Sequence, residues 1–593
     1  MHAALRSINA LNQAYLPPTE EPWRPLEGRQ QILALMEGTV LAQVLSFMKP
    51  RCCLALRAVS PTARVLAELV QPPAKSALYE MCLSDRVTHK VSAIAAGDSA
   101  RAHLLPSIWW LAQCALPLYL DSIGAWDVLH AAAPALSLMV RGLTVHTGNA
   151  RCVLDAADAQ QLEELRIEGG GAFSIRGESL SQMMQLRRVA VTEYTARVAD
   201  FVLHPPALTE LSIRCKYDAP LDVTQPACAA RLLRLSVTAP TMDTLSWIYQ
   251  CSSLTHLRLR WCASELSVGL VGELPYLTAL SISDSAIRHL DGLHRCRALE
   301  RVNIRNCSQL VSLDGLSGAP RLQWIDASWC AVQTIGELRR CPHLTGIKLH
   351  KCLYLESLEG LAGAPELQSI DATWCVIRTI GELHRCPHLT CVCLYKCFQL
   401  ESLEGLAGAP ELQSIDATWC GIRTIGELHR CPHLTSVKFQ KCFHMEDLEG
   451  LAGAPELRSI DAAWCGAKTI GELRRCPRLA AVTFHKCFHL ESVEGLAGAP
   501  QLQSIDATWC GVRSIGELRR CSHLTSVRFE WCGNIDSLEG LTGAPGLDSV
   551  HTTWLGVRTA GGLHRRPYLV TIMWWIARQL ASLLGLGGAP QFP

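Results

Sequence analysis

The sequence predicts an α/β solenoid, in which short stacked units contribute parallel strands to one curved sheet, preceded by a small all-helical N-terminal domain. Three observations predict this fold. The pair Trp-Cys recurs every 45 residues, at 329/330, 374/375, 419/420, 464/465 and 509/510. The 45-residue repeat divides into halves of 22 and 23 residues, which begin LQSIDATWC (412–420) and LTSVKFQKC (434–442). A chain of 593 residues is also too long for one ordinary core, which favours several domains or a repeat array.

Both halves fit the pattern L-x-x-L-x-L-x-x-C, the strand signature of leucine-rich repeats. The opening leucines fall 22 to 24 residues apart: Leu162, Leu186, Leu208, Leu232, Leu254, Leu277, Leu299, Leu322, Leu344, Leu367, Leu389, Leu412, Leu434, Leu457, Leu479, Leu502, Leu524, Leu547 and Leu569. We therefore predict a leucine-rich repeat horseshoe with a concave parallel sheet over residues 140–593, in about 20 units of which the last is degenerate. Residues 1–30 form an N-terminal segment, and residues 31–139 a helical domain.

The first, fourth and sixth positions of each unit face the core in this prediction, as in Leu412, Ile415 and Ala417. The sixth position alternates between small and large residues, which fills a core without voids. The small set is Ala372, Ala417 and Ala462, and the large set is Leu394, Phe439 and Phe484. The returns between strands are short and rich in Gly and Pro, which predicts tight turns or single helical turns.

Cysteines occupy two columns of the repeat. The ninth position holds Cys330, Cys352, Cys375, Cys397, Cys420, Cys442, Cys465, Cys487, Cys510 and Cys532; the convex return holds Cys296, Cys341, Cys386, Cys431, Cys476 and Cys521. Two interpretations are open: small buried side chains of the solenoid, or metal ligands, because CPH recurs at 341–343, 386–388 and 431–433. The sequence lacks a C-x-x-C pair of zinc spacing, so we predict no metal and no cofactor.

The eighth position alternates between tryptophan and lysine as far as Trp509 and is tryptophan again in the next two units: Trp329, Lys351, Trp374, Lys396, Trp419, Lys441, Trp464, Lys486, Trp509, Trp531 and Trp554. Neighbouring strands place these side chains side by side, so that lysine over indole forms a cation–π contact. The row either stabilises the array through contacts between neighbouring units or forms a partner-binding stripe on the concave face. The seventh position varies between copies and is the candidate for partner specificity: His350, Tyr395, Gln440, His485 and Glu530.

Residues 33–70 have apolar residues at helical spacing, interrupted by Lys-Pro-Arg. The run VLSFMKPRCCLALRAVSPTARVLA (44–67) resembles an F-box, the helical module that joins a substrate receptor to a cullin-type ubiquitin ligase. The matching positions are Val44, Leu45, Phe47, Met48, Pro50, Leu54 and Val59. The resemblance implies that they bind a Skp-family adaptor. The usual Leu-Pro opening is missing and Ala63 stands where tryptophan is usual, so a helical cap for the first repeat is the alternative.

Composition excludes several function classes. The net charge is +1 with 18% charged residues, which argues against nucleic acid or an anionic membrane as partner. The stretch HLLPSIWWLAQCALPLYL (103–120) contains two prolines and is followed by acidic residues, so we expect a buried helical pair rather than a membrane segment. The N-terminus has no signal-peptide pattern. We expect an intracellular protein, cytoplasmic rather than nuclear.

The array resembles the 22-residue class of intracellular leucine-rich repeats and the arrays of trypanosomatid parasites, which implies protein binding on the concave face. Motifs of catalysis, such as a phosphate-binding glycine loop or HExxH, are missing from the sequence, so we predict that it is not an enzyme. We expect a protein-interaction scaffold, with the substrate receptor of a ubiquitin ligase as its specific form. The alternative is a structural or regulatory scaffold with no ubiquitin link.

Overall fold

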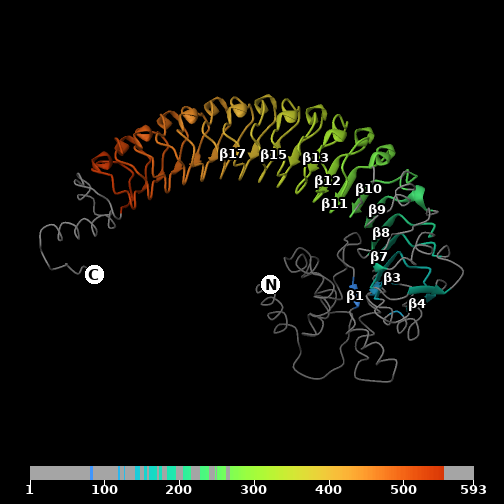
Figure 1. Ribbon diagram of the computed structural model, residues 1–593. Coiled ribbons are helices and arrows are strands. Elements are labelled where there is room, and N and C mark those ends of the chain that lie inside the picture. Colours follow the sequence, from blue (N-terminus) through green and yellow to red (C-terminus); the bar gives the residue numbers. More distant parts are fainter. Residues whose placement is uncertain are drawn as a thin grey trace, which may run out of the picture. The chain divides into compact units, whose positions relative to one another are not determined.

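A computed structural model describes residues 268–552 without a gap and shorter stretches before them. These stretches are 81–83, 118–120, 126, 140–146, 152–155, 159–169, 173–176, 183–194, 205–215, 228–238, 248 and 250–261. The chain divides into two compact units, Met1–Ala239 and Pro240–Pro593. Both are built on ladders of parallel strands with leucine-rich repeat geometry (Figure 1).

In the first unit, seven described strands pair in parallel, each with the next of the series. They are β1 (Met81–Leu83), β2 (Leu118–Leu120), β3 (Val140–His146), β5 (Glu164–Glu168), β7 (Arg188–Tyr194), β8 (Glu210–Cys215) and β9 (Arg234–Thr238). A separate parallel pair joins β4 (Cys152–Asp155) to β6 (Phe173–Arg176), and one 3-10 helix, η3, spans Ala229–Arg231.

Two strands of this ladder lie where the sequence predicts only helices. Strands β1 and β2 fall within residues 31–139, and Leu118 pairs with Val140, which follows it by one repeat length of 22 residues. The prediction of an all-helical segment is therefore wrong at these six residues, because β-prone Leu-Tyr-Leu continues the strand register upstream. No helix in the described stretches is long and apolar enough to cross a bilayer. The domain boundary at residue 140 stays a prediction.

In the second unit, strands β10 to β23 pair consecutively and in parallel. Their bounds are β10 His256–Arg260, β11 Ala279–Ser283, β12 Arg301–Arg305, β13 Trp324–Asp326, β14 Gly346–Lys348, β15 Ser369–Asp371, β16 Cys391–Cys393, β17 Ser414–Asp416, β18 Ser436–Lys438, β19 Ser459–Asp461, β20 Ala481–Thr483, β21 Ser504–Asp506, β22 Ser526–Arg528 and β23 Ser549–His551. The strands line the inner side of this unit's arc (Figure 1). Equivalent positions pair in register, as Ile370, Val392 and Ile415 do.

The core of the second unit lies between this sheet and the returns, where the predicted inward positions are buried. Leu412 and Ala417 are 0% exposed and Ile415 is 2% exposed. The large residues of the sixth position, including Phe439 and Phe484, are among the most deeply buried side chains. The predicted alternation of small and large core residues is confirmed.

Short 3-10 helices form the convex side, as the Gly and Pro content of the returns predicts. They are η4 Val268–Glu273, η5 Leu293–Arg295, η6 Asp314–Leu316, η7 Leu338–Arg340, η8 Glu359–Leu361, η9 Leu383–Arg385, η10 Glu404–Leu406, η11 Leu428–Arg430, η12 Glu449–Leu451, η13 Leu473–Arg475, η14 Glu494–Leu496, η15 Leu518–Arg520 and η16 Glu539–Leu541. Successive returns approach closely through glycines: a Cβ on Gly405 would lie 1.8 Å from the carbonyl oxygen of Gly381.

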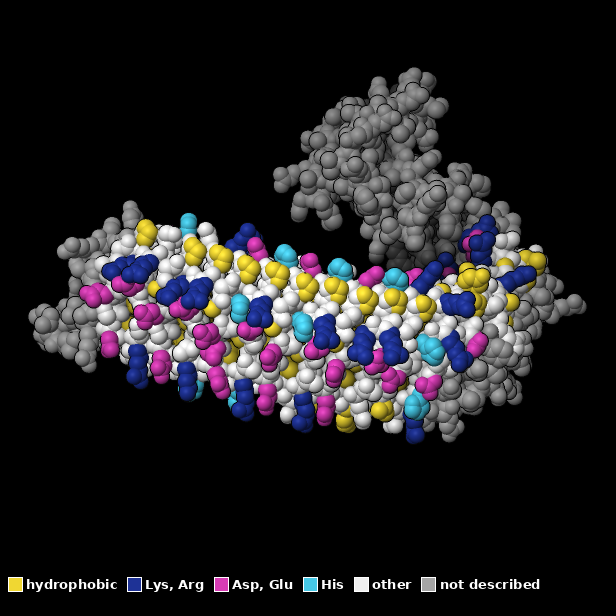
Figure 2. All heavy atoms as spheres, turned by 90° about the horizontal axis from the view of Figure 1, so that it is seen from above, with side chains coloured by type: hydrophobic (Ala, Val, Ile, Leu, Met, Phe, Trp, Pro, Cys, Tyr) yellow, Lys and Arg dark blue, Asp and Glu magenta, His cyan; other side chains and the backbone are white. Residues whose placement is uncertain are grey.

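The convex surface carries basic and acidic side chains interspersed along the array (Figure 2). Many form exposed ion pairs, such as Arg378 with Glu356 at 3.7 Å and Arg385 with Glu382 at 3.0 Å. Exposed pairs of this kind contribute about 0–1 kcal/mol each. The described part of this convex surface therefore presents no broad field of one sign.

Candidate partner-binding surface

Three residues after each strand from β13 to β22 lies a residue with left-handed backbone, and this residue is the tryptophan or lysine of the eighth position. The φ angle is 63° at Trp419 and 60° at Lys441. The amide of this residue still donates to the seventh-position carbonyl of the next unit, as from Trp419 to Gln440 at 2.7 Å. The hydrogen-bonded ladder thus holds the turn in place on both sides.

Left-handed backbone is unusual for such bulky side chains. It raises the free energy by about 1–2 kcal/mol for a residue with a Cβ, and Asn, Asp and Gly tolerate it best. The two units before β13 follow this preference, with Asp284 and Asn306 at the same position. An exposed cation–π contact stabilises the fold by about 0.5–1 kcal/mol, and an aromatic pair by about 0.5–1.5 kcal/mol. The contacts of Trp and Lys therefore offset the backbone strain without a clear surplus.

The predicted cation–π contacts are confirmed in geometry. The ammonium group of Lys351 lies 3.6 Å from the ring centroid of Trp329, and that of Lys396 lies 3.7 Å from Trp374. The corresponding distances are 4.2 Å from Lys441 to Trp419 and 4.4 Å from Lys486 to Trp464. At the end of the described row, tryptophan replaces lysine, and Trp509 and Trp531 stack with centroids 4.7 Å apart. Trp554 lies outside the described residues.

A second column of apolar side chains follows the cysteines at the tenth position of every other unit. Leu353, Phe398, Phe443 and Phe488 are each more than half exposed, at 55%, 53%, 52% and 56%. The phenylalanine rings contact the tryptophans edge to face, with centroids 6.0 Å apart for Trp419 and Phe443 and 6.2 Å apart for Trp464 and Phe488. This column was not predicted from the sequence, although Phe or Leu recurs directly after Lys-Cys in the repeat.

The two columns form one surface along the carboxyl ends of the strands, which we call the rim stripe. It comprises Trp329, Lys351, Leu353, Trp374, Lys396, Phe398, Trp419, Lys441, Phe443, Trp464, Lys486, Phe488, Trp509 and Trp531. The variable seventh-position side chains are half-buried beside it. His350 packs against Trp329 with ring centroids 6.0 Å apart, and Lys396 lies 5.3 Å from the ring of Tyr395. Burial against this surface lowers the pKa of His350, so this imidazole is neutral at neutral pH.

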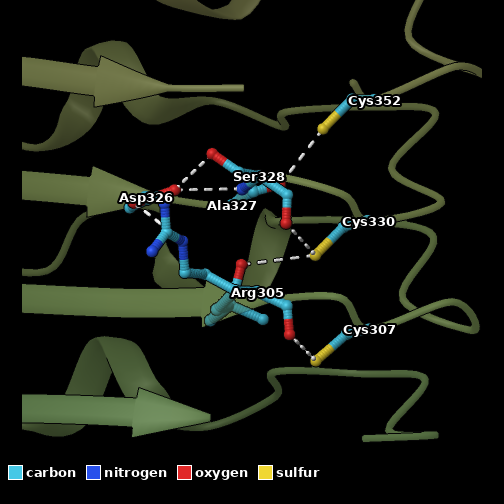
Figure 3. A network of polar contacts seen from close by, with 8 residues as sticks. Arg305, Cys307, Asp326, Ala327, Ser328, Cys330 and Cys352 are labelled. Atoms are coloured by element: carbon cyan, nitrogen blue, oxygen red, sulfur yellow. Dashed lines mark hydrogen bonds and ion pairs between the residues drawn. The ribbon is translucent and has the colours of Figure 1, made fainter. Parts of the chain in front are cut away.

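Aspartates at the fifth position stabilise the turn that precedes the rim stripe. The Oδ1 atoms of Asp371 and Asp416 each accept the amide N–H two residues on, at 3.1 Å. Asp326 makes the same bond to Ser328 and also pairs with Arg305 at 3.3 Å (Figure 3). These carboxylates satisfy donors that the ladder leaves open, and their role is structural.

The cysteines of both columns are buried, and their thiols bond to backbone carbonyls. The ninth-position Sγ atoms donate to the sixth-position carbonyl of the preceding unit, from Cys352 to Ala327 at 3.1 Å and from Cys330 to Ile304 at 3.3 Å (Figure 3). In the convex column, Cys386 donates to Leu361 at 3.2 Å. The thiols therefore link successive units and fill their core.

Burial makes the thiols of Cys442 and Cys296 poor nucleophiles. Burial raises the pKa of Cys442 to about 12 and that of Cys296 to about 11. Such groups stay protonated at neutral pH, and the thiolate is the reactive form. Within the described ranges, no group of three or more His, Cys, Asp or Glu side chains is placed to hold a metal ion. The contacts support the structural interpretation of the cysteines.

The predicted adaptor-binding residues cannot be placed relative to this surface. Val44, Leu45, Phe47, Met48, Pro50, Leu54 and Val59 all lie outside the described residues. The F-box-like segment therefore remains a resemblance in sequence.

Comparisons with solved structures find leucine-rich repeat proteins at low similarity. The internalin inlF of Listeria monocytogenes is 15% identical, with a TM-score of 0.39, over 54% of this chain and 87% of that one. The functional domain of InlJ from Listeria monocytogenes, which includes a cysteine ladder, is 15% identical with a TM-score of 0.36, over 63% and 75% of the two chains. The plant peptide hormone receptor RGFR1, solved in complex with RGF2, is 11% identical with a TM-score of 0.36, over 76% and 88%. Searches of protein-family models and of curated proteins gave no match.

Proposed function

We propose that this protein is an interaction scaffold whose rim stripe binds a protein partner. One observation carries the proposal: bulky aromatic and lysine side chains occupy a left-handed position where Asn, Asp or Gly fits better. Their contacts with one another only offset that strain, so stability alone does not account for the row. An unfavourable backbone state retained in many consecutive units points to a role outside folding.

The chemistry of the stripe suits protein recognition. Phe398, Phe443 and Phe488 expose apolar area beside half-buried indoles, and contiguous apolar surface of this kind marks interaction sites. Tryptophan is enriched among residues that dominate binding energy. The lysines add charge at regular intervals of two strands, about 10 Å along the sheet. The half-buried seventh-position side chains, which differ between copies, are proposed to set specificity.

The proposal is tested with a variant that removes the stripe while leaving the fold. Trp419→Asn together with Trp464→Asn replaces two indoles by residues suited to left-handed backbone. We expect this variant to unfold at nearly the wild-type urea concentration and to lose partners that the wild-type chain captures, as measured by quantitative affinity capture. Arg378→Gln with Arg423→Gln on the convex side is the matched control and should retain them. Capture of the same proteins by all three chains would show that the stripe does not bind partners.

A second, more specific form of this function is a substrate receptor of a cullin-type ubiquitin ligase. The F-box resemblance of residues 44–67 supports it. In that case residues 44–67 would hold a Skp-family adaptor while the array holds the substrate, and the resulting proximity would raise the effective concentration of the substrate. Recovery of the adaptor with the wild-type chain, but not with Leu45→Ala or Phe47→Ala, is the expected result. Equal recovery, or none, leaves the general scaffold with a capping N-terminal segment.

A further inference from the structure

Strands β10, β11 and β12 present a group of arginines on the concave face, ahead of the rim stripe. The middle strand exposes only small side chains, Ala279, Ser281 and Ser283, all half-buried. In register with them stand His256, Arg258 and Arg260 on β10 and Arg301, Asn303 and Arg305 on β12. The intervening residues of all three strands point into the core. We call this surface, with its floor of small residues on β11, the arginine trough.

Two of the four guanidinium groups already have carboxylate partners. Arg260 bonds Asp284 at 3.0 Å, and Arg305 pairs with Asp326 at 3.3 Å. Hydrogen bonds from Asn306 and Arg260 lower the pKa of Asp284, so its charge is present at neutral pH.

Arg258 and Arg301 differ from these two. Both are exposed, and in the part of the chain that the structure describes neither has a carboxylate within 4.0 Å. The trough therefore carries about two positive charges without local partners, on a protein whose net charge is only +1. Guanidinium groups in this state bind anions with paired hydrogen bonds.

The spacing of these arginines suits one small anion. Arg258 and Arg301 lie two strands apart, and their positions in the register of the sheet differ by two residues. Their Cα atoms are therefore separated by about 12 Å. Each long side chain needs to span about half of that distance to reach a common point above β11, between Ala279 and Ser281. The hydroxyl group of Ser281 lies on the floor between them and can donate a third hydrogen bond.

We propose that the arginine trough binds a phosphate monoester, carried as a phosphorylated side chain by a protein partner. Charge decides between the anions: a phosphate monoester carries about −1.5 to −2 at pH 7 and matches two guanidinium groups. A carboxylate or a phosphodiester carries a single negative charge and leaves one guanidinium uncompensated. The inference deepens the proposed function and rests on it for the partner being a protein, but the trough and the rim stripe share no residue.

The test uses the full chain and short synthetic peptides of neutral sequence. One peptide carries a single phosphoserine, and the others carry serine or glutamate at that position. We expect the phosphoserine peptide to bind at least about tenfold more tightly than the serine peptide in calorimetric titration, with a loss of about tenfold for Arg258→Gln or Arg301→Gln. Arg423→Gln on the convex side is the matched control and should bind like wild type. Arg258 and Arg301 are exposed, so their replacement should leave the urea midpoint unchanged.

Several results would overturn the assignment. These are equal affinity for the phosphoserine and serine peptides, equal affinity of the Gln variants and wild type, or tighter binding of a thymidine oligonucleotide that depends on the same two arginines. The rim variant Trp419→Asn with Trp464→Asn separates this inference from the proposed function. If it loses protein partners while the phosphopeptide fails to bind, only the trough assignment fails; if the phosphopeptide binds and partner capture is unaffected, only the rim assignment fails.

Discussion

We predict that the positions of the left-handed tryptophans reverse the usual order of stability between alanine and glycine. In regular strands glycine is less stable than alanine by about 0.5–1 kcal/mol, because its unfolded chain has more freedom. At Trp374, Trp419 and Trp464 the φ angle lies between 60° and 63°, where a Cβ is strained and glycine is not. We therefore compare two triple variants, one with alanine and one with glycine at all three positions.

The expected difference in unfolding free energy follows from what the two variants share. Both lose the same indole contacts, so the difference between their stabilities reports only the effect of the backbone conformation. Alanine keeps a strain of about 1–2 kcal/mol per site, and the extra unfolded-state entropy of glycine opposes this by about 0.4–1 kcal/mol. The net difference is about 1 kcal/mol per site in favour of glycine. The sites are about 10 Å apart, a separation at which effects on stability add, so the triple glycine variant should be more stable by about 3 kcal/mol.

Urea unfolding followed by circular dichroism measures this difference, provided that the slope with denaturant is the same for both variants. The matched control is Ser414, which lies in strand β17 and outside the left-handed positions. There Ser414→Ala should be more stable than Ser414→Gly. An alanine triple variant as stable as the glycine triple variant would refute the assigned backbone conformation and, with it, the argument that the row is not maintained by stability.

Three further predictions concern the core and the returns. Gly405→Ala should destabilise by more than about 2 kcal/mol in urea unfolding, because the added Cβ meets a backbone oxygen at 1.8 Å. Gly408→Ala is the control: its added Cβ meets nothing nearer than Arg430 Cβ at 4.0 Å, so only the positive φ of 85° opposes it, at a cost of about 1 kcal/mol. Cys420→Ala should cost about 1–3 kcal/mol, since it removes the donor to the Leu394 carbonyl at 3.0 Å, and an unchanged midpoint would contradict a structural role. The raised pKa of Cys442, about 12 against an ordinary 9.0, means that its thiol stabilises the fold fully below pH 9 and progressively less toward pH 12. The stability advantage of wild type over Cys442→Ala should therefore shrink between about pH 9 and pH 11, and a constant difference would contradict the burial of that thiol.

Periodicity allowed the sequence to predict the core and the returns. A leucine every 22 or 23 residues is required because each unit buries its apolar side chains only against its neighbours. The positions of Leu412 and Phe439 in the core, the single helical turns and the lysine–indole contacts follow from that register. Each depends on spacing alone, which a sequence displays directly.

Features that depend on backbone conformation or on two adjacent units were not predicted. Tryptophan and lysine do not favour left-handed backbone, so these residues give no indication of that conformation in the sequence. Asp284 and Asn306, which tolerate it, stand at the same position of two earlier units and do indicate it. Strand β2 was concealed because its apolar sequence fits a buried helix equally well. The arginine trough can be recognised only from the register of three strands, which places Arg258 and Arg301 on either side of the small side chains of β11.

The trough and the rim stripe lie next to each other on one sheet. Strand β12 pairs directly with β13, whose unit carries Trp329 at its eighth position. From the middle of the trough to this first indole is about two strands across the sheet and three residues along it, or roughly 14 Å, a distance that about four residues of extended peptide span. A partner that binds both surfaces gains an effective concentration of about millimolar for its second contact, so that two weak sites give avidity about 10²–10⁴ above either alone. Such a partner would lose most of this gain when either surface is altered, whereas a partner held by one surface would be indifferent to changes in the other. Because the curved sheet fixes the distance between the sites, a scaffold that binds through both proposed surfaces would select partners by the spacing of their phosphate and apolar groups as well as by their chemistry.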